Sequence, residues 1–416
     1  MTTIQQTAKT TSSHRIYKSI VLKQLAKLQH AQLTVHCDGE QHVFGEPHAE
    51  LKADLHIIDN ECWPILANHG SVGAGQAFAQ GLLHSEHLTD AVRIFARNID
   101  VLDAIDNRWT QLSKYVLKGF HFMRRNSRKG SRDNIAAHYD LGNDLFTRFL
   151  DPTMMYSSAQ FLSATDTLEQ GQINKLQRIC QKLDLKPSEH LLEIGTGWGS
   201  MAIYAALHYG CRVTTTTLSQ EQHDYTKAAI EAAGLSSQIT LLMQDYRDLR
   251  GSFDKLVSIE MIEAVGHRYL PTYFEQCAHL LKPDGLMLLQ AITIRDQRYE
   301  AATKTVDFIQ RYIFPGGALP SIQVMLNIVS DKTDMNLIQQ EDFGAHYART
   351  LHMWHDNFKA ARTELKTVGY DDYFYRLWVF YLCYCEGGFI ERTIGCSQLL
   401  FAKPQAQRAP LIHALT

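Results

Sequence analysis

The sequence predicts an α/β protein in which a doubly wound, Rossmann-like domain follows a smaller N-terminal α+β domain. Strand and helix patterns alternate from about residue 188 to residue 294, as in a parallel sheet with helices on both faces. A glycine-rich turn joins the first of these strands to a helix. With 416 residues, 45% of them hydrophobic, the chain is long enough for a large core and more than one domain.

The glycine-rich turn is the strongest local signal. An apolar run ending in Glu193 predicts a buried parallel strand. Gly195, Gly197 and Gly199 allow the backbone after it to bend sharply and to approach a ligand. The helix predicted at 200–209 directs its N-terminus at the same place. This spacing occurs in dinucleotide folds and in S-adenosylmethionine folds, so the next strand must distinguish them.

The second strand, predicted at 212–217, favours S-adenosylmethionine. A dinucleotide fold would place an acidic residue at its tip, about 20 residues on, to hold a ribose. No acid is found there, and the chain continues into a turn formed by Thr217, Leu218, Ser219 and Gln222. Ser219 is expected to be the N-cap of the next helix, with Gln222 at its third position.

Three more strands complete the predicted sheet. The third, at 239–243, ends before Asp245 and Tyr246, an acid and an aromatic residue that could bracket an adenine. The fourth, at 253–259, leads into residues 260–263, and the fifth follows the turn at 282–285. We therefore expect a methyltransferase-type domain, with a nicotinamide enzyme as the alternative.

The N-terminal segment predicts a separate unit of roughly 100 residues. Strands are expected at 33–36, 53–58 and 62–66, and helices from 72 to 99. The glycine-rich residues 70–75 lack the strand-to-helix context of a phosphate loop and predict a turn. The expected division is a domain at 1–110, a basic linker at 111–135 and the larger domain at 136–416.

The linker region is strongly basic. No acid lies between Asp106 and Asp133, whereas eight Lys and Arg residues and several aromatic residues do. The region could be a solvated linker, or a segment that meets anionic lipid headgroups, where each basic residue contributes on the order of 1 kcal/mol. Nucleic acid would use the same charges. Because the net charge is only −3 and no nucleic-acid motif is found, no such partner is expected.

Cysteine usage and hydropathy predict the cellular setting. The eight cysteines form no CxxC pair, which is typical of a reduced cytoplasmic protein without a metal site. Residues 1–13 lack the apolar stretch of a signal peptide. No apolar run approaches the roughly 20 residues of a membrane span. We therefore expect a cytoplasmic protein.

Several ordered motifs give the chain a family resemblance. They are HYDLGNDLF at 138–146, LDPTMMYSSA at 150–159, EIGTGWG at 193–199, TLS at 217–219, EMIEAVG at 260–266, YIFPGG at 312–317, FGAHY at 343–347 and YCEGGF at 384–389. Over about residues 135–403 the chain resembles the cyclopropane-fatty-acyl-phospholipid synthase family. The N-terminal segment is similar to the small lipid-binding domain of that family.

The resemblance implies a class I methyltransferase that transfers a methyl group from S-adenosylmethionine to the cis double bond of an acyl chain in a membrane phospholipid. Methylation of an alkene leaves a carbocation, which must lose a proton before a cyclopropane ring closes. The site must therefore exclude water, present aromatic faces and hold a base. The resemblance also implies a peripheral enzyme at the inner face of the membrane. Its oligomeric state is left open, with a homodimer among the expected forms.

In the family the base is a bound bicarbonate. Its ligands map to Ser158, Glu263, Gln290, Ile292 and Tyr347. Ser158 stands where the family usually has cysteine, and Gln290 where it usually has histidine. Both keep hydrogen-bond donors, but the substitutions put in question the strength of bicarbonate binding and the product. Cys385 aligns with a cysteine once proposed as the nucleophile, although transfer from a sulfonium needs no thiol.

The resemblance and the predicted sheet together give the candidate cofactor residues. They are Tyr156, Ser157, Glu193, Gly195, Gly197, Gly199, Thr217, Leu218, Ser219, Gln222, Asp245 and Tyr246.

Three of the catalytic candidates also have a purely structural explanation. Glu263 could be a surface carboxylate at a helix start, Tyr347 a core aromatic residue and Cys385 a buried small side chain. His138 and Tyr139 could cap or pack instead of closing over the cofactor. The aromatic residues near the C-terminus could form core or an acyl-chain wall. The alternative functions are a methyltransferase that makes methyl-branched chains or acts on a small molecule, and a lipid-binding protein with a relict cofactor fold.

Overall fold

The computed structural model describes residues 12–99 and 142–407, which divide into two compact units. The first unit contains the described residues 12–99, 305–313 and 354–393, and the second contains 142–304, 314–353 and 394–407. This division differs from the expected boundary because two later segments group with the N-terminal one. The predicted basic linker, His138 and Tyr139 lie outside the described residues.

The second unit is built on a seven-stranded sheet with the strand order β10-β11-β9-β8-β5-β6-β7. The parallel strands are β5 (His190–Ile194), β6 (Arg212–Thr217), β7 (Ile239–Met243), β8 (Phe253–Ile259) and β9 (Leu281–Ile294). Two antiparallel strands, β11 (Ile394–Ala402) and β10 (Asn336–Asp342), extend the sheet beyond β9. The predicted doubly wound α/β fold is confirmed.

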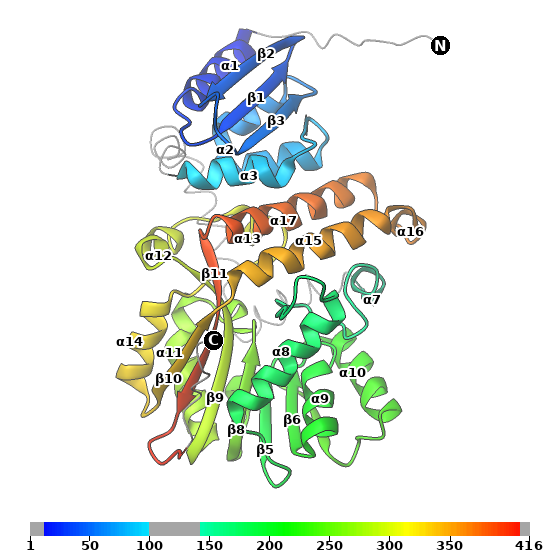
Figure 1. Ribbon diagram of the computed structural model, residues 1–416, viewed down its shortest axis with the longest axis vertical. Coiled ribbons are helices and arrows are strands. Elements are labelled where there is room, and N and C mark those ends of the chain that lie inside the picture. Colours follow the sequence, from blue (N-terminus) through cyan, green and yellow to red (C-terminus); the bar gives the residue numbers. More distant parts are fainter. Residues whose placement is uncertain (1–11, 100–141, 408–416) are drawn as a thin grey trace. The chain divides into compact units, whose positions relative to one another are not determined.

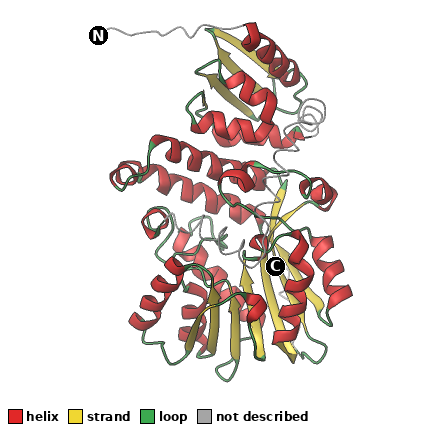
Figure 2. Cartoon of the chain, turned by 180° about the vertical axis from the view of Figure 1, so that it is seen from behind, coloured by secondary structure: helices red, strands yellow, loops and turns green. Residues whose placement is uncertain are grey.

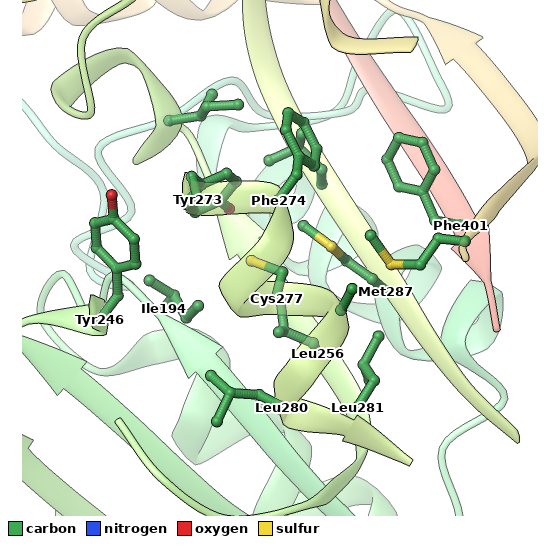
Figure 3. Packing of buried hydrophobic residues seen from close by; sticks show 14 of the residues in the cluster. Ile194, Tyr246, Leu256, Tyr273, Phe274, Cys277, Leu280, Leu281, Met287 and Phe401 are labelled. Carbon is green, nitrogen blue, oxygen red and sulfur yellow. The ribbon is translucent and has the colours of Figure 1, made fainter. Parts of the chain in front are cut away.

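Helices cover both faces of this sheet (Figure 1). One layer contains α8 (Leu168–Leu183), α9 (Ser200–Tyr209) and α10 (Gln220–Ala232), and the other contains α11 (Leu270–Leu280) and α14 (Ile322–Lys332). Side chains alternate between the faces along each strand. Leu191 therefore packs with the α8 and α9 cluster, whereas Leu192 packs with the α11 and α14 cluster. In the second cluster, Phe274 of α11 points toward Phe401 of β11 (Figure 3).

The remaining elements of this unit are short or shared. They are α7 (Asn143–Phe146), η1 (Tyr246–Asp248), η2 (Ile262–Ala264), η3 (His267–Tyr269) and α12 (Asp296–Ala302), together with the part of α15 (Gly344–Ala360) up to Met353.

The first unit has a four-stranded sheet with the order β2-β1-β3-β4, visible as the smaller sheet in Figure 2. Its strands are β1 (Gln32–Cys37), β2 (Glu40–Gly45), β3 (Lys52–Ile57) and β4 (Leu83–His84). Its helices are α1 (Ser12–Leu25), α2 (Cys62–Ala79), α3 (Leu88–Arg97), α13 (Phe308–Tyr312), the end of α15, α16 (Arg362–Thr367) and α17 (Asp372–Ile390). The strands predicted at 33–36 and 53–58 are confirmed as β1 and β3.

Two predictions for this unit were wrong. Residues 62–66 begin helix α2 and form no strand, since a short apolar run cannot be assigned to a strand or a buried helix from periodicity alone. Residues 70–75 lie within the same helix, which kinks at Gly70 (φ 51°). A Cβ at Gly75 would lie 2.3 Å from the ring of Phe308, so the glycines allow close helix packing.

Segments far apart in sequence hold the first unit together. Arg93 and Arg97 of α3 donate from their Nε atoms to the two carboxylate oxygens of Glu391, at 2.8 and 2.7 Å. The hydroxyl of Thr89 donates to Glu386 of α17 at 2.8 Å. No helix in the described part of the chain combines the length and the apolar character that crossing a bilayer requires.

Candidate active site

A buried network supports the glycine-rich turn after β5. The hydroxyl of Thr215 donates to Glu193 Oε2 at 2.6 Å, and the hydroxyls of Thr196 and Thr215 lie 2.7 Å apart. Because the single hydroxyl proton of Thr215 goes to Glu193, Thr196 donates to Thr215. Desolvation raises the pKa of Glu193 to about 8. Glu193 therefore anchors Thr196, which lies inside the turn.

The three glycines of the turn all have positive φ angles, between 55° and 101°. A Cβ at Gly195 would lie 3.1 Å from Met261, and one at Gly199 would lie 2.7 Å from Thr226. A Cβ at Gly197 would meet no described atom within 4 Å. The space beside Gly197 is thus open for a ligand, whereas the other two glycines allow protein packing.

The turn after β6 has the predicted cap. Ser219 Oγ accepts from the Gln222 backbone N–H at 3.3 Å at the start of α10, which confirms Ser219 as the N-cap. The Thr217 hydroxyl donates to Gln222 Oε1 at 2.8 Å and accepts from the Ser219 N–H at 3.1 Å. Leu218 lies within this closed set of hydrogen bonds.

Asp245 and Tyr246, the candidate adenine contacts, both have partners within the protein. The carboxylate of Asp245 makes a bidentate pair with Arg247, with distances of 2.8 and 2.6 Å. The ring of Tyr246 packs edge-on against Tyr273, with 5.5 Å between ring centroids, inside the hydrophobic cluster of Figure 3. Their role toward an adenine stays a prediction.

The centre of the site is a carboxylate that was not predicted. Glu260 follows β8, at the carboxyl end of the parallel strands where ligands bind in such sheets. Its Oε1 accepts from the Ser158 backbone N–H at 3.0 Å and from Gln290 Nε2 at 2.8 Å. Its Oε2 accepts from the Tyr347 hydroxyl at 2.7 Å. Three of the predicted site residues thus converge on one side chain.

Glu263 lies beside Glu260. Its Oε1 accepts from the Ile292 backbone N–H at 2.6 Å, and its buried Oε2 has no hydrogen-bond partner among the described residues. Desolvation, followed by the charge of Glu260, raises the pKa of Glu263 to about 8. Two adjacent carboxylates resist joint ionisation. Because Glu260 accepts three strong hydrogen bonds, the negative charge belongs on Glu260, and Glu263 holds the proton at neutral pH.

A chain of side chains fixes the orientation of the Gln290 amide. Lys182 Nζ donates to Gln398 Oε1 at 2.7 Å, and Gln398 Nε2 donates to Gln290 Oε1 at 3.1 Å across the β9–β11 pair. An ammonium group can only donate, so it sets the direction of both amides. Gln290 is thereby left with its Nε2 toward Glu260. Lys182 is itself paired with Glu341 at 2.5 Å.

Lys175 is a second site residue that the sequence analysis missed. It is fully buried on α8, and its Nζ donates to the Ser157 hydroxyl at 2.7 Å. Desolvation lowers its pKa to about 8, although the nearby charge of Glu260 acts in the opposite direction. The signal was present in the sequence, since Lys175 follows Gln172 and precedes Ile179 at the spacing of one buried helix face.

The residues do not fit a bound bicarbonate. Ser158 offers its backbone N–H, while its hydroxyl donates to the Ala159 carbonyl at 3.0 Å. Together with Gln290 and Tyr347 it already contacts Glu260, and Ile292 already contacts Glu263. A bicarbonate would find these donors in use and would bring a further negative charge beside two carboxyl groups.

Aromatic rings lie near the glycine-rich turn after β5. The ring of Tyr156 packs edge-on against Phe146 at 5.2 Å and lies 6.3 Å from Phe314. Trp198 of the glycine turn packs on Phe146 at 4.8 Å. Its indole N–H donates to Asn143 at 2.7 Å. These rings offer the π faces that a developing cation requires.

Cys385 belongs to the first unit, on α17. Desolvation and the charge of Asp307 raise the pKa of its thiol, the reverse of what a nucleophilic thiolate needs. The aromatic side chains of Trp354, Trp378 and Tyr381 are buried in the core of the same unit.

The chain is similar to several known proteins. Residues 126–399 match the family described as mycolic acid cyclopropane synthetase. The tuberculostearic acid methyltransferase of Mycobacterium tuberculosis is 38% identical over 334 residues, 78% of this chain and 77% of that protein. The cyclopropane-fatty-acyl-phospholipid synthase of Escherichia coli K12 is 35% identical over 356 residues, 84% of this chain and 88% of that protein. A crystal structure of a mycolic acid cyclopropane synthase complexed with SAH and CTAB matches with a TM-score of 0.61 at 30% identity, covering 65% of this chain and 98% of that chain.

Proposed function

The chain belongs to the mycolic acid cyclopropane synthetase family of S-adenosylmethionine-dependent methyltransferases, and we propose that it forms a cyclopropane ring at the cis double bond of an unsaturated acyl chain in a membrane phospholipid. One observation carries the proposal: a half-buried pair of carboxyl groups stands at the carboxyl ends of the strands, next to an open glycine-rich turn. The similarity to the Escherichia coli phospholipid synthase extends over most of both chains and supports the substrate class.

Different residues of the chain would bind the cofactor, exclude water and accept the proton. S-adenosylmethionine, when bound, supplies an electrophilic methyl group. The turns after β5 and β6 would hold it, because Gly197 leaves room for it and Glu193 and Ser219 fix the two turns. Aromatic rings around Tyr156 would exclude water and stabilise positive charge on the acyl chain. The carboxyl pair would remove the proton that ring closure releases.

A second product is a branched chain. The relative that is 38% identical is a tuberculostearic acid methyltransferase, and Ser158 and Gln290 depart from the family pattern in this chain. A 1,2-hydride shift can first move the positive charge to the carbon that carries the new methyl group. Loss of a proton from that methyl group then forms a C=C bond, which leaves a methylene branch instead of a ring.

Lipid analysis tests the function and separates the two products. The purified full chain is incubated with S-adenosylmethionine and vesicles of a phospholipid with one cis double bond in each acyl chain. We expect lipids that have gained one CH₂, and proton NMR distinguishes a cyclopropane ring from a methylene branch. Vesicles of the saturated lipid are the matched control and should gain nothing. Methyl transfer to a small amine, with no change in the lipid, would contradict the proposal.

We also propose that the enzyme acts as a peripheral protein at the inner face of the membrane. The motivation is the acid-free basic region, which lies outside the described residues. The test replaces four of its residues by Gln: Arg124, Arg125, Arg128 and Lys129. At low ionic strength this variant should sediment less with anionic vesicles, and salt should reduce wild-type binding because it screens the charges. Equal binding of both proteins to anionic and neutral vesicles would show that the region is only a linker.

A further inference from the structure

We propose that Glu260 is the general base of this enzyme and takes the place of the bicarbonate used in the family. This inference rests on the proposed function, since it names the proton acceptor for the same reaction. The residues of this site do not fit a bound bicarbonate. Three of the groups mapped as bicarbonate ligands instead donate to the carboxylate of Glu260, which the chain itself provides.

The surroundings of Glu260 form a built anion site. Its three donors come from separate parts of the second unit: the loop at Ser158, strand β9 at Gln290 and helix α15 at Tyr347. Glu260 is half-buried, and desolvation is the largest influence on its pKa, which it raises despite the donors. A carboxyl group with a raised pKa is more basic than usual and is therefore suited to accept a proton.

The backbone of Glu260 supports a functional role. Its φ angle is 50°, in the left-handed region that glycine adopts easily and that other residues enter at a cost. Such conformations persist where the surrounding structure holds them, and they cluster at active sites. Here three hydrogen bonds to the side chain hold the residue in place.

The two carboxylate oxygens are not equivalent. Oε1 accepts from two N–H groups and lies 3.7 Å from Cys396 Sγ, whereas Oε2 accepts one hydrogen bond among the described residues, from Tyr347. Oε2 therefore keeps a lone pair for the proton. The neutral Glu263 beside it adds no competing charge.

Glu260 also lies close to the glycine-rich turn after β5. Ser258 Oγ donates to the Ile194 carbonyl at 3.1 Å, which ties the end of β8 to the start of the turn. On the other side of Glu260, Met261 comes within 3.1 Å of where a Cβ on Gly195 would lie. The base is thus held between two contacts to the turn that is expected to carry the methyl donor.

The proton transfer is balanced as follows. After the methyl group has moved from sulfur to the alkene, one of its C–H bonds breaks. The electron pair of that bond forms the last C–C bond of the ring, and the proton goes to Glu260 Oε2. The sulfonium has become a neutral thioether, and Glu260 returns its proton to water after the product leaves.

The first experiment needs no variant. Turnover of the full-length protein on unsaturated phospholipid vesicles is measured in CO₂-free buffer, before and after bicarbonate is added. We expect no change, and a rise on adding bicarbonate would overturn the proposal. If the wild type converts no lipid at all, the proposed function has failed, and that outcome is distinct from a failure of Glu260.

Two substitutions complete the test. Glu260→Gln keeps the shape of the side chain but cannot accept the proton, so turnover should fall by about 10²-fold or more while calorimetry shows unchanged S-adenosylmethionine affinity. Glu300→Gln, on an exposed carboxylate of α12, is the matched control and should behave as wild type. Glu260→Gln turnover close to that of the control would overturn the proposal.

Glu260→Gly provides a rescue. Glycine suits the left-handed backbone, and removal of the side chain frees the three donors for an external anion. This variant should be slow in CO₂-free buffer and should recover when bicarbonate or formate is added. A folded variant that binds S-adenosylmethionine but is not rescued would contradict the assignment of these donors as the anion site.

Discussion

Gln398 provides the sharpest test of how the site is oriented. It contacts neither Glu260 nor Glu263. Because its Oε1 accepts from Lys182, its Nε2 is left to donate to Gln290 Oε1, and this fixes the orientation of the Gln290 amide. Gln398→Leu removes both contacts. Gln398→Glu keeps an acceptor for Lys182 but offers no N–H to Gln290, whose amide should then rotate its Nε2 toward the new carboxylate and its Oε1 toward Glu260.

The structure sets the size of the two effects. In Gln398→Leu, the fully buried Gln290 Oε1 loses its donor, which costs about 1–3 kcal/mol, and Lys182 loses a charged hydrogen bond of about 1.5–3 kcal/mol. The free energy of unfolding should fall by about 3 kcal/mol or more. Gln398→Glu should be more stable than Gln398→Leu, because the new carboxylate pairs with Lys182. In Gln398→Glu the rotated Gln290 amide no longer donates to Glu260, so turnover should fall by about tenfold or more, and below that of Gln398→Leu.

Urea unfolding and lipid turnover, measured on the same preparations, separate orientation from stability. Gln340→Leu, an exposed position on β10, is the control for adding an apolar side chain to this sheet. If Gln398 acted only through stability, Gln398→Glu would recover turnover together with stability. That result would refute the orientation argument.

Three further predictions concern single residues. Gly197→Val should abolish S-adenosylmethionine binding in calorimetry, because the valine side chain would fill the open space beside the turn. The φ angle of 55° at this position also disfavours a branched residue. Unchanged affinity would contradict the placement of the cofactor beside Gly197. Folding raises the pKa of Glu193 from 4.5 to about 8, so the folded protein binds this proton more tightly than the unfolded chain does. The free energy of unfolding of the wild type should therefore fall as the pH rises across this range. At 1.36 kcal/mol per pH unit, the fall is at most about 5 kcal/mol. Urea unfolding of Glu193→Gln should lack this part of the pH slope, and equal slopes would be contrary to expectation. Cys385→Ala should change turnover by less than about tenfold in the lipid assay, because the raised pKa of the Cys385 thiol makes it a poor nucleophile. A larger loss of turnover would indicate that Cys385 takes part in the chemistry.

Much of the parallel sheet could be predicted because its signals are local. The strands at 212–217, 239–243 and 253–259 and the helix at 200–209 have the bounds that the sequence indicated. Buried strands appear as continuous apolar or β-branched runs between turn residues, so each can be recognised from its own segment. The strand expected at 62–66 failed for the same reason, since a buried helix start such as that of α2 has a similar composition.

The site was predictable only where a residue's neighbours in sequence define its role. Ser219 was recognised as an N-cap from the residues that follow it. Glu260 was overlooked, although it lies three residues before Glu263, because its partners at Ser158, Gln290 and Tyr347 are brought together by the fold. The pairing of Asp245 with Arg247 likewise depends on side-chain direction, which composition does not reveal.

The order of segments in the first unit has a consequence for synthesis on the ribosome. Arg93 and its partner Glu391 are separated by 298 residues, and α17, which packs against α2 and α3, lies near the end of the chain. At about 5–20 residues per second, the partner helix emerges roughly 15–60 s after the N-terminal sheet. During that interval the apolar faces of α2 and α3 lack their native cover. The nascent chain therefore presents a surface on which a chaperone can act, and fragments that end before residue 354 retain that exposed surface.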